Sequence, residues 1–116
     1  MSKNYSPAFI EKAHRATIYN EPEILKSTLC TCFYCGAQFN PQGEEYLPWT
    51  DGTGGRPHTL LCPYCGIDAV IGDSSGFPVD ELEFIYACSS LWFGFCSRIA
   101  HGTPLHRRPP ILIEVD

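Results

Sequence analysis

The longest amphipathic pattern in the chain runs from Asp80 to His101 and predicts a helix. Asp80 with Glu83 three positions later is typical of a capping box, and Gly102 suits the position after the last turn. Residues at three- and four-residue spacing are expected on one stripe: Leu82, Ile85, Ser89, Trp92, Cys96 and Ile99. Further aromatic residues lie outside that stripe: Phe84, Tyr86, Phe93 and Phe95. We therefore expect this helix to expose aromatic surface.

The N-terminal pattern predicts another helix over residues 6–19, followed by a short helical turn. Ser6 is placed to cap the first of these, Pro7 suits its first turn, and Asn20 is placed to cap the second. In the middle of the chain, "TLLC" and "IDAVIG" are typical of short strands. Helices at both ends of a region of short strands predict an α+β fold.

At 116 residues the chain is expected to form a single domain, residues 1–116. Its segments are a helical N-terminal part (1–29), a cysteine-rich centre (30–78), the aromatic helix (79–102) and a basic turn with a strand-like tail (103–116). A chain of this size buries only a modest core. A cross-link in the cysteine-rich centre would therefore add needed stability.

Two cysteine pairs in that centre have the same form, "CFYCG" at residues 32–36 and "CPYCG" at residues 62–66. We call these the first and the second knuckle. Two residues between thiolates allow a tight turn that points both sulfurs at one ion, and the glycine suits a positive φ. The pattern predicts one metal site with four ligands: Cys32, Cys35, Cys62 and Cys65. The expected fold is a small zinc ribbon of short antiparallel strands, packed with the N-terminal and C-terminal helices.

Four thiolates suit either zinc or iron, and we favour one Zn²⁺ per chain. The knuckles are similar to those of rubredoxin, a one-iron electron carrier, so an iron site is the alternative. A closed site of four thiolates leaves no position for substrate, and we expect the metal to be structural. Among the remaining cysteines, Cys30 is an alternative ligand to Cys32, whereas Cys88 and Cys96 are expected to fill the core.

The net charge of the chain and its lack of targeting signals make some classes of function less suitable. The formal net charge of −5 disfavours a nucleic-acid partner, because phosphate binding depends on Lys and Arg. A nucleic-acid-binding ribbon that uses Arg107 and Arg108 stays as an alternative. The N-terminus lacks a signal-peptide pattern, and the longest apolar run is too short to span a membrane. We expect a cytoplasmic protein, in which paired cysteines hold metal more often than disulfides.

The stretch "GDSSG" at residues 72–76 resembles the nucleophile turn of serine hydrolases. That chemistry needs a base within hydrogen-bond reach and a third group to orient the base. Here the motif continues into Phe77 and Pro78 as a loop, and the chain is too short for the large sheet that such a turn requires. We expect a turn at this place and predict no enzymatic activity.

The second knuckle and its continuation, "CPYCGIDAVIGDSSGFP", resemble a family of small bacterial cytoplasmic proteins of unknown function. The matching positions are Cys32, Cys35, Phe39, Pro41, Trp49, Cys62, Cys65, Gly66, Ile67, Asp68, Val70, Ile71, Gly72, Ser75, Gly76 and Pro78. The chain from Gly94 onward departs from the pattern. The resemblance implies a cytosolic zinc protein of bacteria or phages, without an established activity. It also suggests that Asp68 bonds backbone N–H groups of the knuckle.

These features together predict a non-enzymatic, zinc-stabilised protein-binding module. Its expected interface comprises Trp49, Trp92, Phe93, Phe95, Arg107 and Arg108. An acidic module of this size would suit an immunity or regulatory protein of a bacterial toxin or defence system, because opposite charges accelerate association with a basic partner. The sequence leaves the oligomeric state open.

Overall fold

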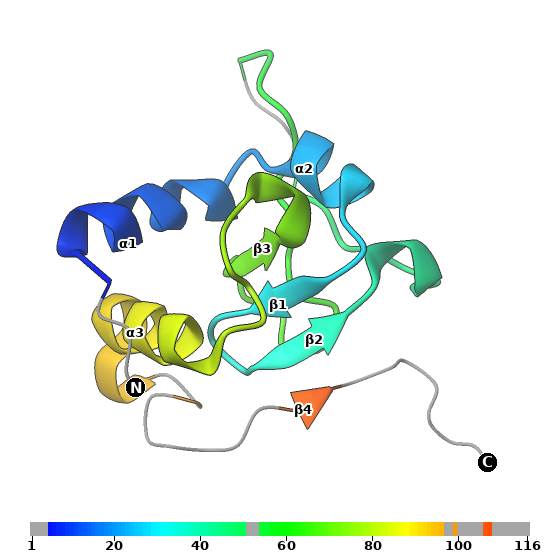
Figure 1. The fold of residues 1–116 in the computed structure, drawn as a ribbon. Coiled ribbons are helices and arrows are strands. Elements are labelled where there is room, and N and C mark those ends of the chain that lie inside the picture. The colour runs from blue at the N-terminus through cyan, green and yellow to red at the C-terminus, as the bar shows by residue number, and fades with distance from the viewer. Residues whose placement is uncertain (1–4, 51–53, 97–98, 100–105, 108–116) are drawn as a thin grey trace.

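Three strands at the centre of the molecule carry the helices of an α+β fold (Figure 1). The computed structural model describes residues 5–50, 54–96, 99 and 106–107. The helices are α1 (Pro7–His14), α2 (Glu21–Lys26) and α3 (Leu82–Phe93), with short 3-10 turns η1 (Arg15–Thr17), η2 (Pro41–Gly43), η3 (Asp73–Ser75) and η4 (Gly94–Cys96). The strands are β1 (Cys30–Cys32), β2 (Ala37–Phe39), β3 (Val70–Gly72) and β4 (His106–Arg107).

The sheet has the order β3-β1-β2-β4. Strand β1 pairs antiparallel with both β2 and β3, so that Thr31 lies opposite Gln38 on one side and Ile71 on the other. All residues of β1, β2 and β3 are buried, which explains why their sequences do not alternate between apolar and polar. The prediction of short antiparallel strands is thus confirmed for these three, whereas β4 pairs parallel with β2.

Helix α1 begins as predicted, because the Ser6 hydroxyl accepts a hydrogen bond from the Phe9 N–H. The predicted capping role of Asn20 before α2 is wrong. Its buried side chain instead donates to the carbonyls of Ala16 and Val70 and accepts the Leu60 N–H. Asn20 therefore ties the end of η1 to β3 and to the chain before the second knuckle.

Helix α3 is shorter than predicted and ends at Gly94, which has a φ of 56°. The expected capping box is absent, since the N-cap residue is Glu81 and its side chain makes no capping bond. The buried face consists of Phe84, Ile85, Cys88 and Ser89, whereas Leu82 of the expected stripe is 49% exposed. Ile85, Ser89 and Ile99 of the expected stripe are buried and Trp92 is half-buried, so the predicted stripe is confirmed in part. Phe84 and Cys88 widen the buried face beyond it, because aromatic residues surround the helix.

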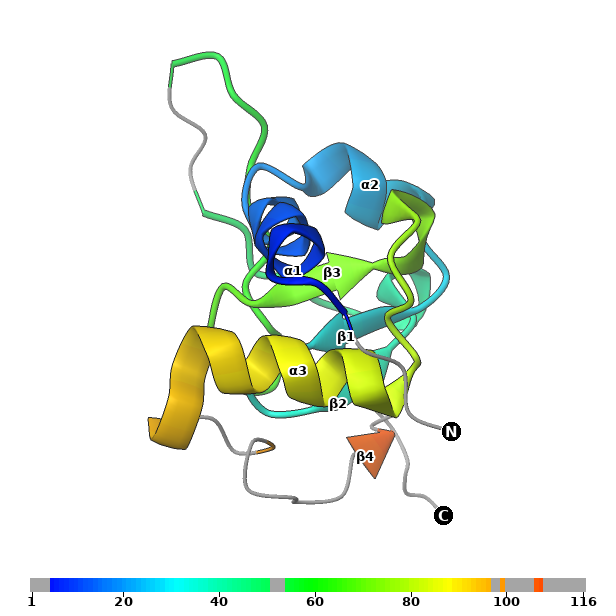
Figure 2. The ribbon, with the colours of Figure 1, turned by 60° about the vertical axis from the view of Figure 1, so that its left-hand side comes forward.

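Helices α1 and α3 lie side by side against the sheet (Figures 1 and 2). Phe84 of α3 is wholly buried between them, which corrects the expectation that it would be exposed. Its ring contacts four other aromatic rings, those of Tyr5, Phe9, Phe33 and Phe77. Aromatic pairs of this kind add to the stabilisation that burial alone provides.

The predicted strand-like tail is represented by β4, in which His106 pairs with Ala37 and Arg107 with Gln38. Arg108 and the residues after it lie outside the described part of the chain. The predicted strand "TLLC" is reduced to a single bridge between Leu60 and Trp49. No described helix has the length and hydropathy that crossing a membrane requires.

Candidate metal centre

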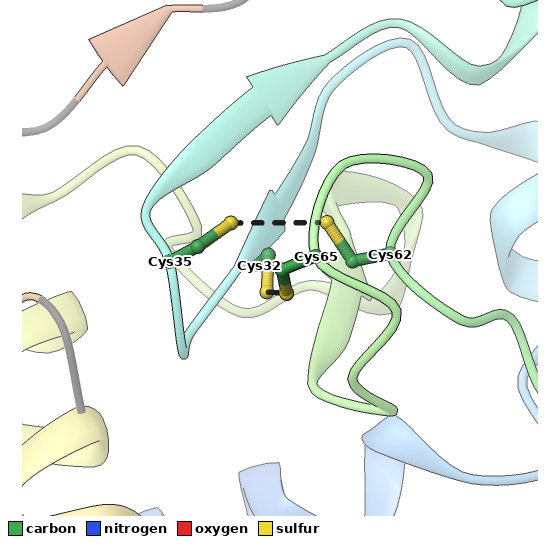
Figure 3. Close-up of side chains that lie close together, drawn as sticks. All are labelled: Cys32, Cys35, Cys62 and Cys65. Carbon is green, nitrogen blue, oxygen red and sulfur yellow. Dashed lines mark hydrogen bonds between the residues drawn. The ribbon is translucent and has the colours of Figure 1, made fainter. Parts of the chain in front are cut away.

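The four cysteines of the two knuckles converge on one point (Figure 3). Their sulfur atoms all lie within 4.8 Å of one another. The first knuckle is the turn between β1 and β2, and the second directly precedes the chain that leads into β3. Because β1 pairs with β3, and the Phe33 N–H donates to the Ala69 carbonyl at 2.8 Å, the sheet itself brings the knuckles together.

The two knuckles have the same backbone geometry. The N–H of Gly36 donates to the Cys32 carbonyl and that of Gly66 to the Cys62 carbonyl, each at 2.9 Å. Both glycines have a φ of 82°, where a side chain would be strained. The N–H of the tyrosine in each turn also points at the first sulfur, at 3.4 Å in the first knuckle and 3.3 Å in the second.

These distances fit a tetrahedral ion. A metal–sulfur distance of about 2.3 Å in a tetrahedron places neighbouring sulfurs roughly 3.8 Å apart. The Sγ atoms of Cys32 and Cys65 are 3.7 Å apart, and those of Cys35 and Cys62 are 3.8 Å apart. The N–H groups aimed at the sulfurs suit thiolates better than neutral thiols. Cys32, Cys35, Cys62 and Cys65 would thus hold one ion, and zinc and iron fit them equally well.

The close sulfur atoms also affect one another's pKa. Hydrogen bonding with the other three cysteines, together with burial, raises the pKa of Cys32. The pKa of Cys35 is lowered, because its sulfur accepts hydrogen bonds from the other cysteines and from the Ala37 N–H. Hydrogen bonds from Cys32, Cys62 and the Ile67 N–H lower the pKa of Cys65 against the opposing effects of Cys35 and burial. Thiolates are the form that binds a cation, so metal binding at this cluster would release protons.

The first knuckle is anchored to α3 by aromatic packing. The ring of Phe33 is wholly buried and lies 5.8 Å from the ring of Phe84 and 5.5 Å from that of Trp92. Tyr34 packs edge-on against Phe93 at 5.2 Å. Sequence reasoning missed this role of Phe33. Its signal was an apolar residue at the position where the second knuckle has Pro63, which is common in exposed turns.

The other cysteines lie outside the cluster. Cys30 is buried, and burial raises its pKa to about 12, which keeps it a neutral thiol. The structure thus supports Cys32 over Cys30 as the partner of Cys35. Cys88 fills the core as predicted, and burial raises its pKa to about 12. The same prediction is wrong for Cys96, which is exposed in η4.

The "GDSSG" stretch stabilises a turn, as expected. The Ser74 hydroxyl donates to the Glu23 carbonyl and the Ser75 hydroxyl to the Gly72 carbonyl, both at 2.6 Å. A Cβ on Gly72 would lie 2.2 Å from the Ser27 hydroxyl oxygen, so this position admits only glycine. Both serines are thus used by the fold.

The carboxylate of Asp73 in this turn accepts backbone N–H groups just before β1, whereas Asp68 does not bond the knuckle as was expected. Asp73 accepts the backbone N–H groups of Thr28 and Leu29, which lowers its pKa against the opposing effect of burial. Asp68 is exposed and has no hydrogen bond among the described residues. Two histidines are placed away from the serines, with His14 against the Trp92 ring and His58 bonded to the Thr50 carbonyl.

Three of the six side chains of the expected interface lie in the described part of the chain. Trp49 is half-buried in its bridge with Leu60, and Trp92 and Phe93 are half-buried against the first knuckle. The side chains of Phe95, Arg107 and Arg108 lie outside the described part of the chain. Among the described residues, the large apolar side chains that are exposed are instead Tyr46, Leu91, Leu25, Leu82, Ile18 and Tyr64.

No protein-family model, curated protein or solved structure matches the chain. The resemblance to small bacterial zinc proteins therefore remains a prediction.

Proposed function

We propose that the chain is a non-enzymatic protein-binding module whose fold is stabilised by one structural Zn²⁺. The observation that carries the metal assignment is the approach of four sulfurs to within 4.8 Å of one another, with two of the sulfur–sulfur distances at 3.7 and 3.8 Å. Four thiolates complete the coordination of Zn²⁺, so no position remains for water or substrate. When bound, the ion would cross-link the two knuckles and would take no part in a reaction.

The packing around the first knuckle supports a structural role. The ion would fix the turn that carries Phe33, and Phe33 forms part of the surface on which α3 rests. Metal binding and the docking of α3 are therefore expected to be one cooperative event. This coupling explains how a short, glycine-rich centre supports a helix that is aromatic on most sides.

The surface beside the second knuckle supports a protein partner. Tyr46 is 72% exposed, and Tyr64, 37% exposed, donates its hydroxyl to Glu44. Glu45 is exposed next to Tyr46, and Trp49 follows three residues later. Exposed tyrosines beside carboxylates are suited to a basic protein surface, since tyrosine and tryptophan often dominate binding energies. We propose an immunity or regulatory role against a basic toxin or defence protein.

Metal content tests the first part of the proposal. Elemental analysis of the untagged protein should find one zinc per chain, and the visible spectrum should show no band. Iron with strong visible absorption would instead favour the rubredoxin-like electron carrier, since the four sulfurs fit iron as well. Protein without stoichiometric metal would overturn the structural assignment.

Binding to the products of neighbouring toxin genes tests the second part. Co-expression should protect cells from the toxin, and Tyr46→Ala should weaken the complex at least tenfold. Glu11→Gln, an exposed carboxylate on α1, is the matched control and should leave binding unchanged. Salt-sensitive retention on DNA or RNA without binding to such a protein would favour the nucleic-acid alternative.

A further inference from the structure

A surface pocket of about 300 Å³ lies where the chain between η1 and α2 meets η3 and the residues after it. None of the four knuckle cysteines lines it, and the proposed function does not use it. The side chains that give it its chemistry are Arg15, Ile18, Tyr19, Glu23, Ser75 and Phe77. Its volume is at the lower end of the range of roughly 300–1,000 Å³ that is typical of small-molecule sites.

The pocket has opposite charges on its rim. Arg15 and Glu23 both line it, and both residues are exposed. Within the described part of the chain, neither group forms an ion pair with the other or with a third side chain. A ligand that carries an anionic and a cationic group could therefore engage both.

The remaining wall is apolar and held in place. Ile18 contributes an aliphatic side chain that is 43% exposed. Phe77 is half-buried, and its ring is fixed by Phe9 at 5.4 Å and Phe84 at 6.2 Å. An apolar group bound here would meet a preformed surface, which reduces the ordering cost of binding.

Backbone strain marks the same place. Tyr19 has a φ of 52° and is the single non-glycine residue with a positive φ in the described part of the chain. Its N–H donates to the Thr59 hydroxyl at 2.8 Å, and the Arg56 guanidinium lies 4.9 Å from its ring centre. Strained residues persist only where their surroundings hold them, and they gather at ligand sites.

We propose that this pocket binds a free α-amino acid with an apolar side chain. The ligand carboxylate would pair with Arg15 and its ammonium group with Glu23. Its side chain would lie against Ile18 and Phe77. An amino acid the size of leucine or phenylalanine matches a small pocket that combines two opposite charges with an apolar wall.

The test is a titration of the metal-loaded full chain with L-leucine and L-phenylalanine, followed by amide NMR shifts. We expect saturable shifts at Tyr19 and Ser75, with a dissociation constant of about 1 mM or below. N-acetyl-leucine amide has the same side chain without the two charges, and it should bind at least tenfold more weakly.

Two variants and two matched controls test whether the charges of Arg15 and Glu23 bind the ligand. Arg15→Gln and Glu23→Gln should each weaken binding at least tenfold, while Lys26→Gln and Glu11→Gln, exposed charges on α2 and α1, should not. All four should keep one metal per chain, so that lost binding cannot be ascribed to unfolding. The proposal is overturned if no saturable shift appears, if the uncharged amide binds equally well, or if controls and pocket variants behave alike.

Discussion

The two knuckles share one backbone and differ in their surroundings. Gly36 and Gly66 have the same φ of 82°, and both turns close with a 2.9 Å hydrogen bond. Yet Phe33 of the first knuckle is wholly buried under α3, whereas Pro63 at the equivalent position of the second is only half-buried. Beside it, Tyr64 reaches the surface and bonds to Glu44. The two knuckles share this turn geometry because four thiolates must surround one ion. The difference shows that one knuckle carries the fold and the other faces solvent.

Removal of a metal ligand should have the largest effect and should not distinguish the knuckles. Cys32→Ser and Cys62→Ser each remove one of four thiolates, and the metal contributes on the order of 10 kcal/mol in small zinc domains. We expect both variants to lose metal and to unfold, as measured by elemental analysis and circular dichroism. Cys96→Ser, which changes an exposed cysteine outside the cluster, should retain metal and fold. A folded, metal-free Cys62→Ser protein would contradict the shared-ligand interpretation.

Substitution of the second residue of each knuckle should separate the two. Phe33→Ala removes a wholly buried ring beneath α3 and should lower the free energy of unfolding by about 3–5 kcal/mol. Pro63→Ala, at the equivalent and only half-buried position, should cost less than about 1 kcal/mol. Denaturant unfolding of metal-loaded protein measures both. Equal losses would mean that the second knuckle supports the core as much as the first.

Substitution of the knuckle glycines tests the shared turn geometry and should have a smaller effect on stability. Gly66→Ala places a methyl group in open space, so its cost is the strain of a positive φ, about 1–2 kcal/mol. Gly36→Ala should cost at least as much, because Gly36 is buried and its Cβ must also find room. Thermal unfolding of the two metal-loaded variants provides the comparison. An unchanged Tm for Gly66→Ala would show that the second knuckle adopts another turn in solution.

The smallest expected effect is that of Tyr64→Phe. This change removes the hydroxyl that donates to Glu44 at 2.8 Å, in a surface bond worth about 0.5 kcal/mol. Stability should therefore stay almost unchanged, while affinity for a basic partner should fall if the surface of Tyr46 and Tyr64 is the interface. Glu11→Gln serves again as the distant control. A loss of stability close to that of Phe33→Ala would place Tyr64 in the core.

The metal ligands were predictable because their signal is local. Two residues between cysteines and a glycine after them define a turn whatever surrounds it, and both turns were found as predicted. The same holds for Ser6, whose capping bond spans three residues. The buried face of α3 was predictable only in part, since Ile85 and Ser89 were expected there but Phe84 was not. The burial of Phe84 depends on where Phe33 and α1 lie, and no spacing within the helix encodes that.

The sequence by itself determined the two knuckle turns, the start of α1 and the general α+β composition, because each rests on contacts between residues close in the chain. Only the tertiary structure decided the roles of Asn20, Asp73 and Phe33, and the exposure of Cys96. Those roles depend on partners brought close by the pairing of β1 with β3 and by the packing of α3. Burial and hydrogen bonding across such distances follow from which elements meet, and a one-dimensional pattern does not specify that.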